Sequence, residues 1–133
     1  MKYEIVVSNM IRLAACIEMI FTESGFYDRI AMVKEAGLVA FEFWELAGKD
    51  VAKIHNASET SELNIAAFTM SSCDQALSVS CQEYGLANPA GRSTAIEVAR
   101  ESIIAAQSLN ARNIIVTVGW ENKDCPDRFS TTA

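Results

Sequence analysis

A helix pattern that runs directly into a continuous apolar strand, over residues 93–119, most constrains what this chain can fold into. Residues at helical spacing mark the predicted inward stripe of that helix: Ile96, Ala99, Arg100, Ile103 and either Ala106 or Gln107. Ser93 is a suitable N-cap, and Asn110 stands where a left-handed residue commonly ends a helix. Residues 114–118 are all β-branched, without polar alternation, which is typical of a strand covered on both faces in a parallel sheet.

The same unit of strand and helix recurs upstream. Strands are predicted over 11–17, 38–43, 63–70 and 113–118, with a further short strand over 2–7. Helices are predicted from a cap at Thr22 or Ser24 to Gly37, and from Asp50 to Ser61. Their buried stripes are Phe26, Ile30, Val33 and Ala36 in the first helix and Val51, Ile54 and Ala57 in the second. Such alternation implies an α/β fold with parallel strands and right-handed crossovers.

The connection formed by residues 71–92 departs from this regularity. It has little hydrophobic periodicity, so it is predicted to be a long loop. Loops of this length inside compact domains tend to be functional or disordered. Because it follows a strand, it belongs to the face where ligand-binding loops gather in α/β folds. A binding role and a plain insertion both remain open.

Charge and cysteine usage exclude several classes of function. The formal net charge is −6, and no Lys/Arg-rich run could neutralise a phosphate backbone, so neither nucleic acid nor a membrane surface is an expected partner. Cys16, Cys73, Cys81 and Cys125 form no C-x-x-C pair, and the lone His55 is not at ligand spacing, which indicates reduced thiols rather than a zinc site. The apolar run near the amino terminus is too short for a signal peptide, so we expect a cytoplasmic protein.

Four segments, in order and with matching spacing, carry a family resemblance. They are residues 11–23 (IRLAACIEMIFTE), 36–44 (AGLVAFEFW), 63–68 (LNIAAF), and 86–119, which contains NPAGR and ends in IIVTVG. Together they resemble the amino-terminal half of hydroxypyruvate-isomerase-like proteins. Those proteins belong to the xylose-isomerase-like TIM-barrel superfamily of sugar isomerases and epimerases.

The resemblance implies the first half of a TIM barrel. A complete (β/α)₈ barrel needs about 250 residues and eight strands. The chain has 133 residues, so we expect parallel (β/α) units with about four strands and three helices, forming an incomplete barrel. Residues 10–121 would form this partial barrel domain, 1–9 an N-terminal extension or extra strand, and 122–133 an irregular C-terminal tail. The expected product is a truncated form of the family.

The resemblance also implies a reaction class. Members of the family shift a proton between adjacent carbons of a sugar or hydroxy-keto acid. The reaction uses a divalent metal, Mg²⁺ or Mn²⁺. The ligands of this metal and two catalytic glutamates lie on the later strands of the complete protein. No catalytic or metal-binding residue is therefore assigned to this chain, no cofactor is expected in it, and we expect it alone to show little or no turnover.

Candidate substrate-binding residues lie at the predicted strand ends and in the loops after them: Cys16, Glu18, Glu42, Trp44, Thr69 and Glu121. Glu42 stands between two phenylalanines, where an unpaired, ionised carboxylate is costly. It either points into the barrel mouth to bind or position a substrate, or pairs with a cation such as Arg12. Trp44 either stacks on a sugar ring or fills the incomplete core.

Two other functions remain open. The chain is alternatively a non-catalytic half-barrel that self-assembles or binds a small polyol through residues 71–92. An apurinic-endonuclease-like DNA repair activity, which shares the superfamily fold, is the more remote alternative. Four strands cut from a closed barrel leave two open edges, so we predict either self-association or poor solubility.

Overall fold

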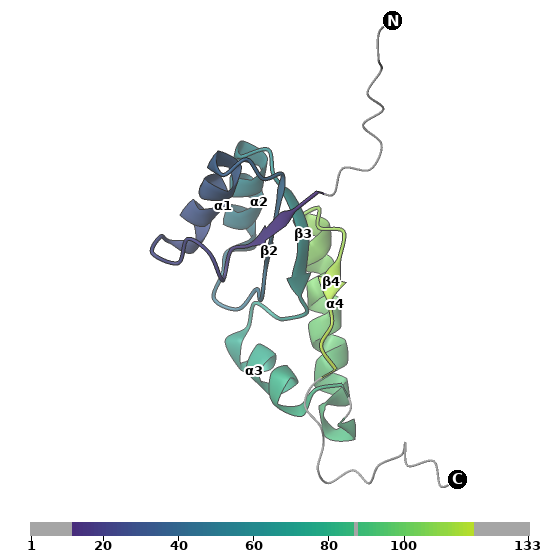
Figure 1. The fold of residues 1–133 in the computed structure, drawn as a ribbon. Helices are drawn as coiled ribbons and strands as arrows, with labels where there is room; N and C mark the ends of the chain where they lie inside the picture. Colours follow the sequence, from purple (N-terminus) through teal and green to yellow (C-terminus); the bar gives the residue numbers. More distant parts are fainter. Residues whose placement is uncertain (1–11, 87, 119–133) are drawn as a thin grey trace, which may run out of the picture.

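Four parallel strands form one open sheet, in the order β1-β2-β3-β4, in the computed structural model (Figure 1). The structure describes residues 12–86 and 88–118, so the predictions for 1–9, Glu121 and 122–133 lie outside the described residues. The elements are β1 (Ala14–Cys16), α1 (Phe26–Glu35), β2 (Ala40–Phe43), α2 (Val51–Thr60), β3 (Asn64–Thr69), α3 (Gln75–Tyr84), the 3₁₀ turn η1 (Pro89–Gly91), α4 (Arg92–Ser108) and β4 (Ile114–Ile115). The predicted α/β class is confirmed, as is the half-barrel architecture.

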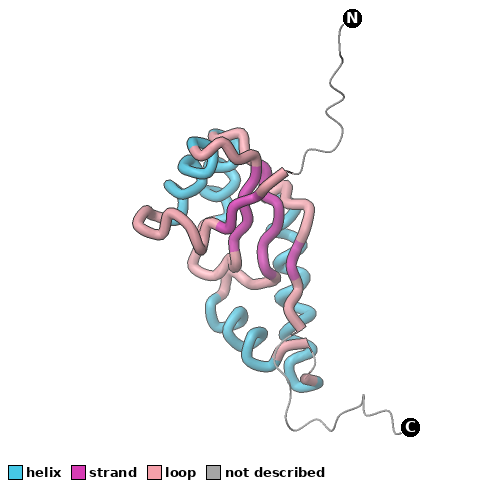
Figure 2. Tube along the Cα trace, viewed as in Figure 1, coloured by secondary structure: helices cyan, strands magenta, loops and turns pink. Residues whose placement is uncertain are grey.

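The main hydrophobic core lies between one face of the sheet and helices α1, α2 and α4. In Figure 2 the strands lie side by side at the centre of the molecule, and the helices lie at its periphery. The core joins side chains from every layer: Phe41, Phe43, Phe68, Ile30, Ile54 and Leu109 are among its fully buried members. Phe43 stacks on Phe68 with ring centroids 5.3 Å apart. Because strand side chains alternate, this packing directs the intervening Glu42 to the opposite face of the sheet.

The prediction of a long loop over residues 71–92 is wrong, because most of this segment is helical. The carboxylate of Asp74 begins α3 by accepting hydrogen bonds from the amides of Ala76 (2.7 Å) and Leu77 (3.1 Å). Gly85 ends the helix with a φ of 64°. The buried residues of α3 are Ser78 and Cys81, which leave little apolar periodicity to detect. The described residues therefore contain four α-helices rather than the predicted three.

Helix α4 buries a stripe that differs from the predicted one except at Ala106, which is buried as predicted. Ile96 and Ile103 are 49% and 53% exposed. The buried stripe consists of smaller side chains: Ala95, Val98, Ser102, Ala105 and Ala106. The N-cap is Gly91, without a side-chain cap, so the predicted cap at Ser93 is also wrong.

Other predicted boundaries agree with the structure in part. Asp50 caps α2 by accepting a hydrogen bond from the Lys53 amide (3.1 Å), as predicted. Asn110 adopts the predicted left-handed conformation, with a φ of 52°. Helix α1 instead begins after Gly25, which replaces the predicted caps at Thr22 and Ser24. Ala36, predicted to be buried, is exposed. Strands β1, β3 and β4 are shorter than predicted at both ends, whereas β2 starts two residues later than predicted and ends at Phe43 as predicted.

Both edges of the sheet are open within the described residues. There, β1 pairs only with β2, and β4 pairs only with β3. Apolar side chains are exposed along these edges, with Leu13 at 64% and Val116 at 51%. Open edges are templates for pairing with further strands. The predicted self-association is untested and stays a prediction.

Candidate substrate-binding face

Three predicted site residues lie together at the carboxyl ends of the strands, which form one end of the sheet. Cys16 is the register partner of Glu42, and Glu42 is the register partner of Ala67. Thr69 ends β3 at the same edge. Because paired residues share a face, Cys16, Glu42 and Ala67 form a row opposite the helix-covered core. We call the sheet face that carries this row the open face.

Glu42 is the carboxylate of this row. Its side chain is partly buried, yet the described residues supply it with neither an ion-pair nor a hydrogen-bond partner. Arg12 precedes Cys16 by four residues, which places it about 13 Å further toward the amino ends of the strands. The alternative that Arg12 pairs with Glu42 is therefore wrong. A carboxylate left without a protein donor can accept hydrogen bonds from the hydroxyl groups of a ligand.

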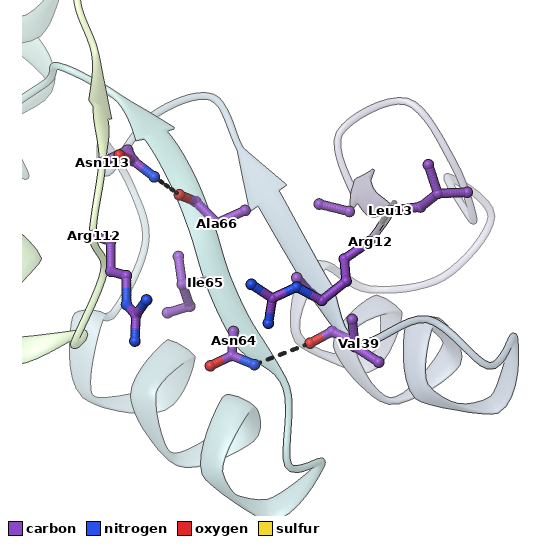
Figure 3. A pocket seen from close by; sticks show the side chains of 10 residues that line it. Arg12, Leu13, Val39, Asn64, Ile65, Ala66, Arg112 and Asn113 are labelled. Atoms are coloured by element: carbon purple, nitrogen blue, oxygen red, sulfur yellow. Dashed lines mark hydrogen bonds between the residues drawn. The ribbon is translucent and has the colours of Figure 1, made fainter. Parts of the chain in front are cut away.

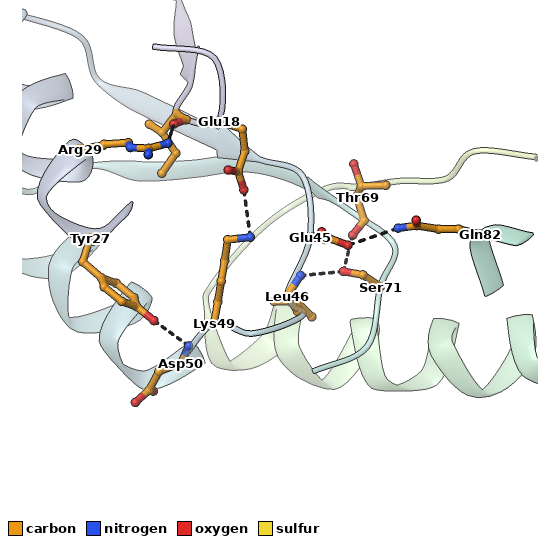
Figure 4. A network of polar contacts seen from close by, with 11 residues as sticks. Glu18, Tyr27, Arg29, Glu45, Leu46, Lys49, Asp50, Thr69, Ser71 and Gln82 are labelled. Carbon is orange, nitrogen blue, oxygen red and sulfur yellow. Dashed lines mark hydrogen bonds and ion pairs between the residues drawn. The ribbon is translucent and has the colours of Figure 1, made fainter. Parts of the chain in front are cut away.

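Glu18, a predicted substrate contact, has a protein partner instead. Its Oε1 lies 2.9 Å from Nζ of Lys49, and the two side chains are 17% and 15% exposed (Figure 4). This Oε1 has no hydrogen-bond partner, so the contact is an ion pair without hydrogen-bond geometry. The Lys49 ammonium also lies 4.9 Å from the ring centroid of Phe26. Lys49 carried no sequence signal because its partner lies on a distant loop.

The indole of Trp44 is 53% exposed just beyond the end of β2. The backbone carbonyl of Trp44 accepts a hydrogen bond from the Thr69 amide (2.9 Å), which fixes the backbone at the ends of β2 and β3. The alternative that Trp44 fills the core is therefore wrong. An exposed indole at this edge is available to stack on a ligand ring.

A buried pair of serines, missed by sequence reasoning, holds the loops of this edge in place. Oγ of Ser71 accepts from the Leu46 amide (2.8 Å) and donates to the Thr69 carbonyl (2.9 Å) (Figure 4). Oγ of Ser102 accepts from the Ser71 amide (2.9 Å) and donates to the Ser71 carbonyl (2.8 Å). These bonds tie the loop after β2 and the end of β3 to α4. Serine was not a candidate because its role depends on partners distant in sequence.

A cavity of about 340 Å³ lies where β3 and β4 end, beneath α3. Its lining joins strand ends to α3 and the turn after it: Thr69, Met70, Cys81, Gln82, Gly85, Leu86 and Thr117. Nε2 of Gln82 donates to a carboxylate oxygen of Glu45 (3.2 Å), joining α3 to the loop after β2. Residues 71–92 therefore contribute directly to the wall of a cavity beside Thr69.

The titratable groups of the described residues do not fit a metal ion. Within 12–86 and 88–118, no group of three His, Cys, Asp or Glu side chains could hold one. Cys16, Cys73 and Cys81 are free thiols there. Burial raises the pKa of Cys81, and burial together with the charge of Glu101 raises the pKa of Cys73. Raised thiol pKa values do not favour a nucleophilic role.

The described helices offer no membrane-spanning segment, since none combines the required length with the required apolar composition.

Comparison with known proteins supports a superfamily rather than a particular enzyme. No protein-family model matches the chain, and no curated protein matches its sequence. The fold is similar to the crystal structure of AP endonuclease, family 2 from Brucella melitensis, with a TM-score of 0.69 and 26% sequence identity. The match covers 83% of this chain and 42% of that chain, so this chain spans less than half the length of its structural neighbour. The likeness supports the xylose-isomerase-like TIM-barrel superfamily but does not confirm the hydroxypyruvate isomerase type.

Proposed function

We propose that this chain supplies the substrate-binding face of a sugar or hydroxy-keto-acid isomerase or epimerase of the hydroxypyruvate isomerase type. The observation that carries the proposal is Glu42, a partly buried carboxylate on the open face with no cationic or donor partner among the described residues. Keeping such a group without a partner costs stability. A substrate hydroxyl group that donates a hydrogen bond to this carboxylate would satisfy it.

The reaction class determines what this face has to do. Isomerisation breaks a C–H bond on one carbon and forms one on its neighbour, while the hydroxyl and carbonyl groups exchange positions without net oxidation. The described residues do not fit the divalent metal of the complete family, so no catalytic step is assigned to them. Glu42 would accept hydrogen bonds from substrate hydroxyls, and Trp44 would stack on the carbon skeleton. Their role is to bind and orient the substrate.

An AP-endonuclease-like activity is the second candidate. The structural likeness to the Brucella melitensis protein favours it. A net charge of −6 opposes it, because binding a DNA backbone depends on releasing counterions from phosphates with Lys and Arg. The two candidates differ in the ligand that they require, so binding separates them.

The test measures equilibrium binding of hydroxypyruvate and of a duplex containing an abasic site. Wild-type chain should bind hydroxypyruvate, and Glu42→Gln should weaken binding about tenfold or more, since a charge-assisted hydrogen bond is lost. Glu59→Gln, an exposed acid on α2, is the matched control and should bind as wild type does. Tight binding of the abasic duplex without hydroxypyruvate binding would favour the endonuclease. Equal affinity in the Glu42→Gln and Glu59→Gln variants would remove Glu42 from the site.

A further inference from the structure

A second cavity, of about 260 Å³, lies at the opposite end of the strands (Figure 3). Its walls come from the amino ends of β1, β2 and β3 and from the residues just before β4, and they include Arg12, Asn64, Arg112 and Asn113. We call it the amino-end pocket. It shares no lining residue with the cavity beside Thr69, and it lies at the opposite end of the strands from Cys16, Glu42 and Thr69.

Small side chains on three neighbouring strands make this pocket hollow. Ala14 and Ala40 are register partners, and Ala66 lies on the next strand. The interior of a TIM barrel is normally filled by layers of bulky branched side chains. Alanine at all three positions leaves space for a molecule. Pockets for drug-sized ligands measure about 300–1,000 Å³, so this pocket suits a smaller ligand.

Two arginines give the pocket its charge. Arg12 and Arg112 enter from opposite sides, and their guanidinium groups extend toward the region of Asn64 between them (Figure 3). Among the described residues, neither guanidinium lies within ion-pair distance of a carboxylate. In a chain with a net charge of −6, such a convergence of two positive charges is a local exception. The positive potential of the two guanidinium groups favours binding of an anion in the pocket.

Two asparagines hold the walls of the pocket in place. Nδ2 of Asn64 donates to the Val39 carbonyl (3.3 Å), and Nδ2 of Asn113 donates to the Ala66 carbonyl (2.9 Å). These bonds tie β3 to the start of β2 and the residues before β4 to β3. Each amide nitrogen keeps a second proton that can be donated to a ligand. The pocket therefore has a braced wall as well as its two charges.

The geometry points to the amino-end pocket as a binding site for a small phosphate-bearing anion. Guanidinium groups present forked donors that match the oxygens of a phosphate, and two of them balance a dianion. A phosphate group has enough oxygens for both arginines at once and for an asparagine amide. A monocarboxylate offers a single charge and two oxygens, so it would leave one arginine without a full partner.

The experiment titrates the chain with inorganic phosphate, glycerol phosphate, acetate and glycerol, following amide NMR signals. Both phosphates should shift the signals of Asn64 and Asn113 in a saturable manner, and glycerol should not. Arg12→Ala and Arg112→Ala should each weaken phosphate binding about tenfold, and the double variant should abolish it. Arg112→Lys should bind more weakly than wild type, because a point charge replaces the fork.

Arg100→Ala is the matched control, since it removes an exposed arginine from α4, away from the pocket. Its phosphate affinity should equal that of the wild type. Both pocket arginines are exposed, so their loss removes no core contact, and circular dichroism will verify that each variant is folded. Absence of saturable shifts would overturn the proposal, as would equal phosphate affinity in the double variant and in Arg100→Ala. Acetate binding as tight as phosphate binding would overturn the assignment to phosphate.

Discussion

Substituting Ser102 by alanine should destabilise the chain by about 2–5 kcal/mol. Ser102 is fully buried, and its hydroxyl is paired with both the amide and the carbonyl of Ser71, at 2.9 and 2.8 Å. Ser71 is itself 1% exposed, so removing the hydroxyl leaves two buried backbone groups without this partner. Each such loss costs about 1–3 kcal/mol. The higher helix propensity of alanine offsets about 0.5 kcal/mol of the total.

Urea unfolding followed by circular dichroism measures this change. The control is Ser108→Ala, the same substitution on the same helix, where the exposed hydroxyl donates to the Ile104 carbonyl (3.1 Å). Its stability should stay within about 0.5 kcal/mol of the wild type. In thermal unfolding, the Ser102 variant should melt about 10 °C lower. Similar free energies of unfolding for the two variants would refute the claim that the serine pair holds the loops at the carboxyl ends of the strands.

Three further predictions follow from the packing and the charges. Val98→Ala should lower the free energy of unfolding in urea by about 2 kcal/mol, because Val98 is fully buried. Ile103→Ala should lower it by less than about 0.5 kcal/mol, because Ile103 is exposed. The reverse order would favour the buried stripe predicted from the sequence. Lys49→Met should lower the free energy of unfolding by about 1–3 kcal/mol, because it leaves the Glu18 carboxylate without its cation. A double-mutant cycle with Glu18→Gln should show coupling between the two residues. Additive effects of the two substitutions would contradict the ion pair. The raised pKa of Cys73 keeps its thiol protonated at a pH where an unperturbed thiol begins to ionise. Iodoacetamide should therefore modify Cys73 more slowly in the folded chain than in urea, and Glu101→Gln should speed the reaction of the folded chain. Equal rates in the folded chain and in urea would contradict the raised pKa.

The alternation of strands and helices was predictable because it depends on local patterns. Continuous apolar runs marked the positions of the strands. The run over 114–118 is not covered on both faces as predicted, because Val116 and Val118 are 51% and 68% exposed. Asp50 and Asn110 carry capping signals that act over a few residues. Those signals were sufficient for the parallel order of the sheet. Helix α3 had its own signals in Asp74 and Gly85, but its buried residues are Ser78 and Cys81, so hydrophobic periodicity did not reveal it.

The inward stripe of α4 shows why periodicity alone can select the wrong face. Bulky isoleucines and small residues both recur along this helix at helical spacing, and hydrophobicity favoured the isoleucines. Close packing of α4 against the sheet and α3 requires the smaller side chains, and this requirement depends on tertiary structure.

Strand-end chemistry was predictable in position but not in pairing. Cys16, Glu42 and Thr69 lie at one edge because parallel strands share their direction. The ion pair of Glu18 with Lys49 joins two loops, and no local pattern specifies it. The pairing of Arg12 with Glu42 was wrong because the two residues lie at different levels of the sheet.

The location of substrate binding is tested most directly by mapping the amide NMR signals of the chain during a hydroxypyruvate titration. If substrate binds at the carboxyl ends of β1, β2 and β3, saturable shifts will appear at Cys16, Glu42 and Thr69, while Asn64 and Asn113 at the other end of the sheet stay unchanged. Shifts confined to Asn64 and Asn113, or no saturable shift at the carboxyl ends, would contradict this placement of the site.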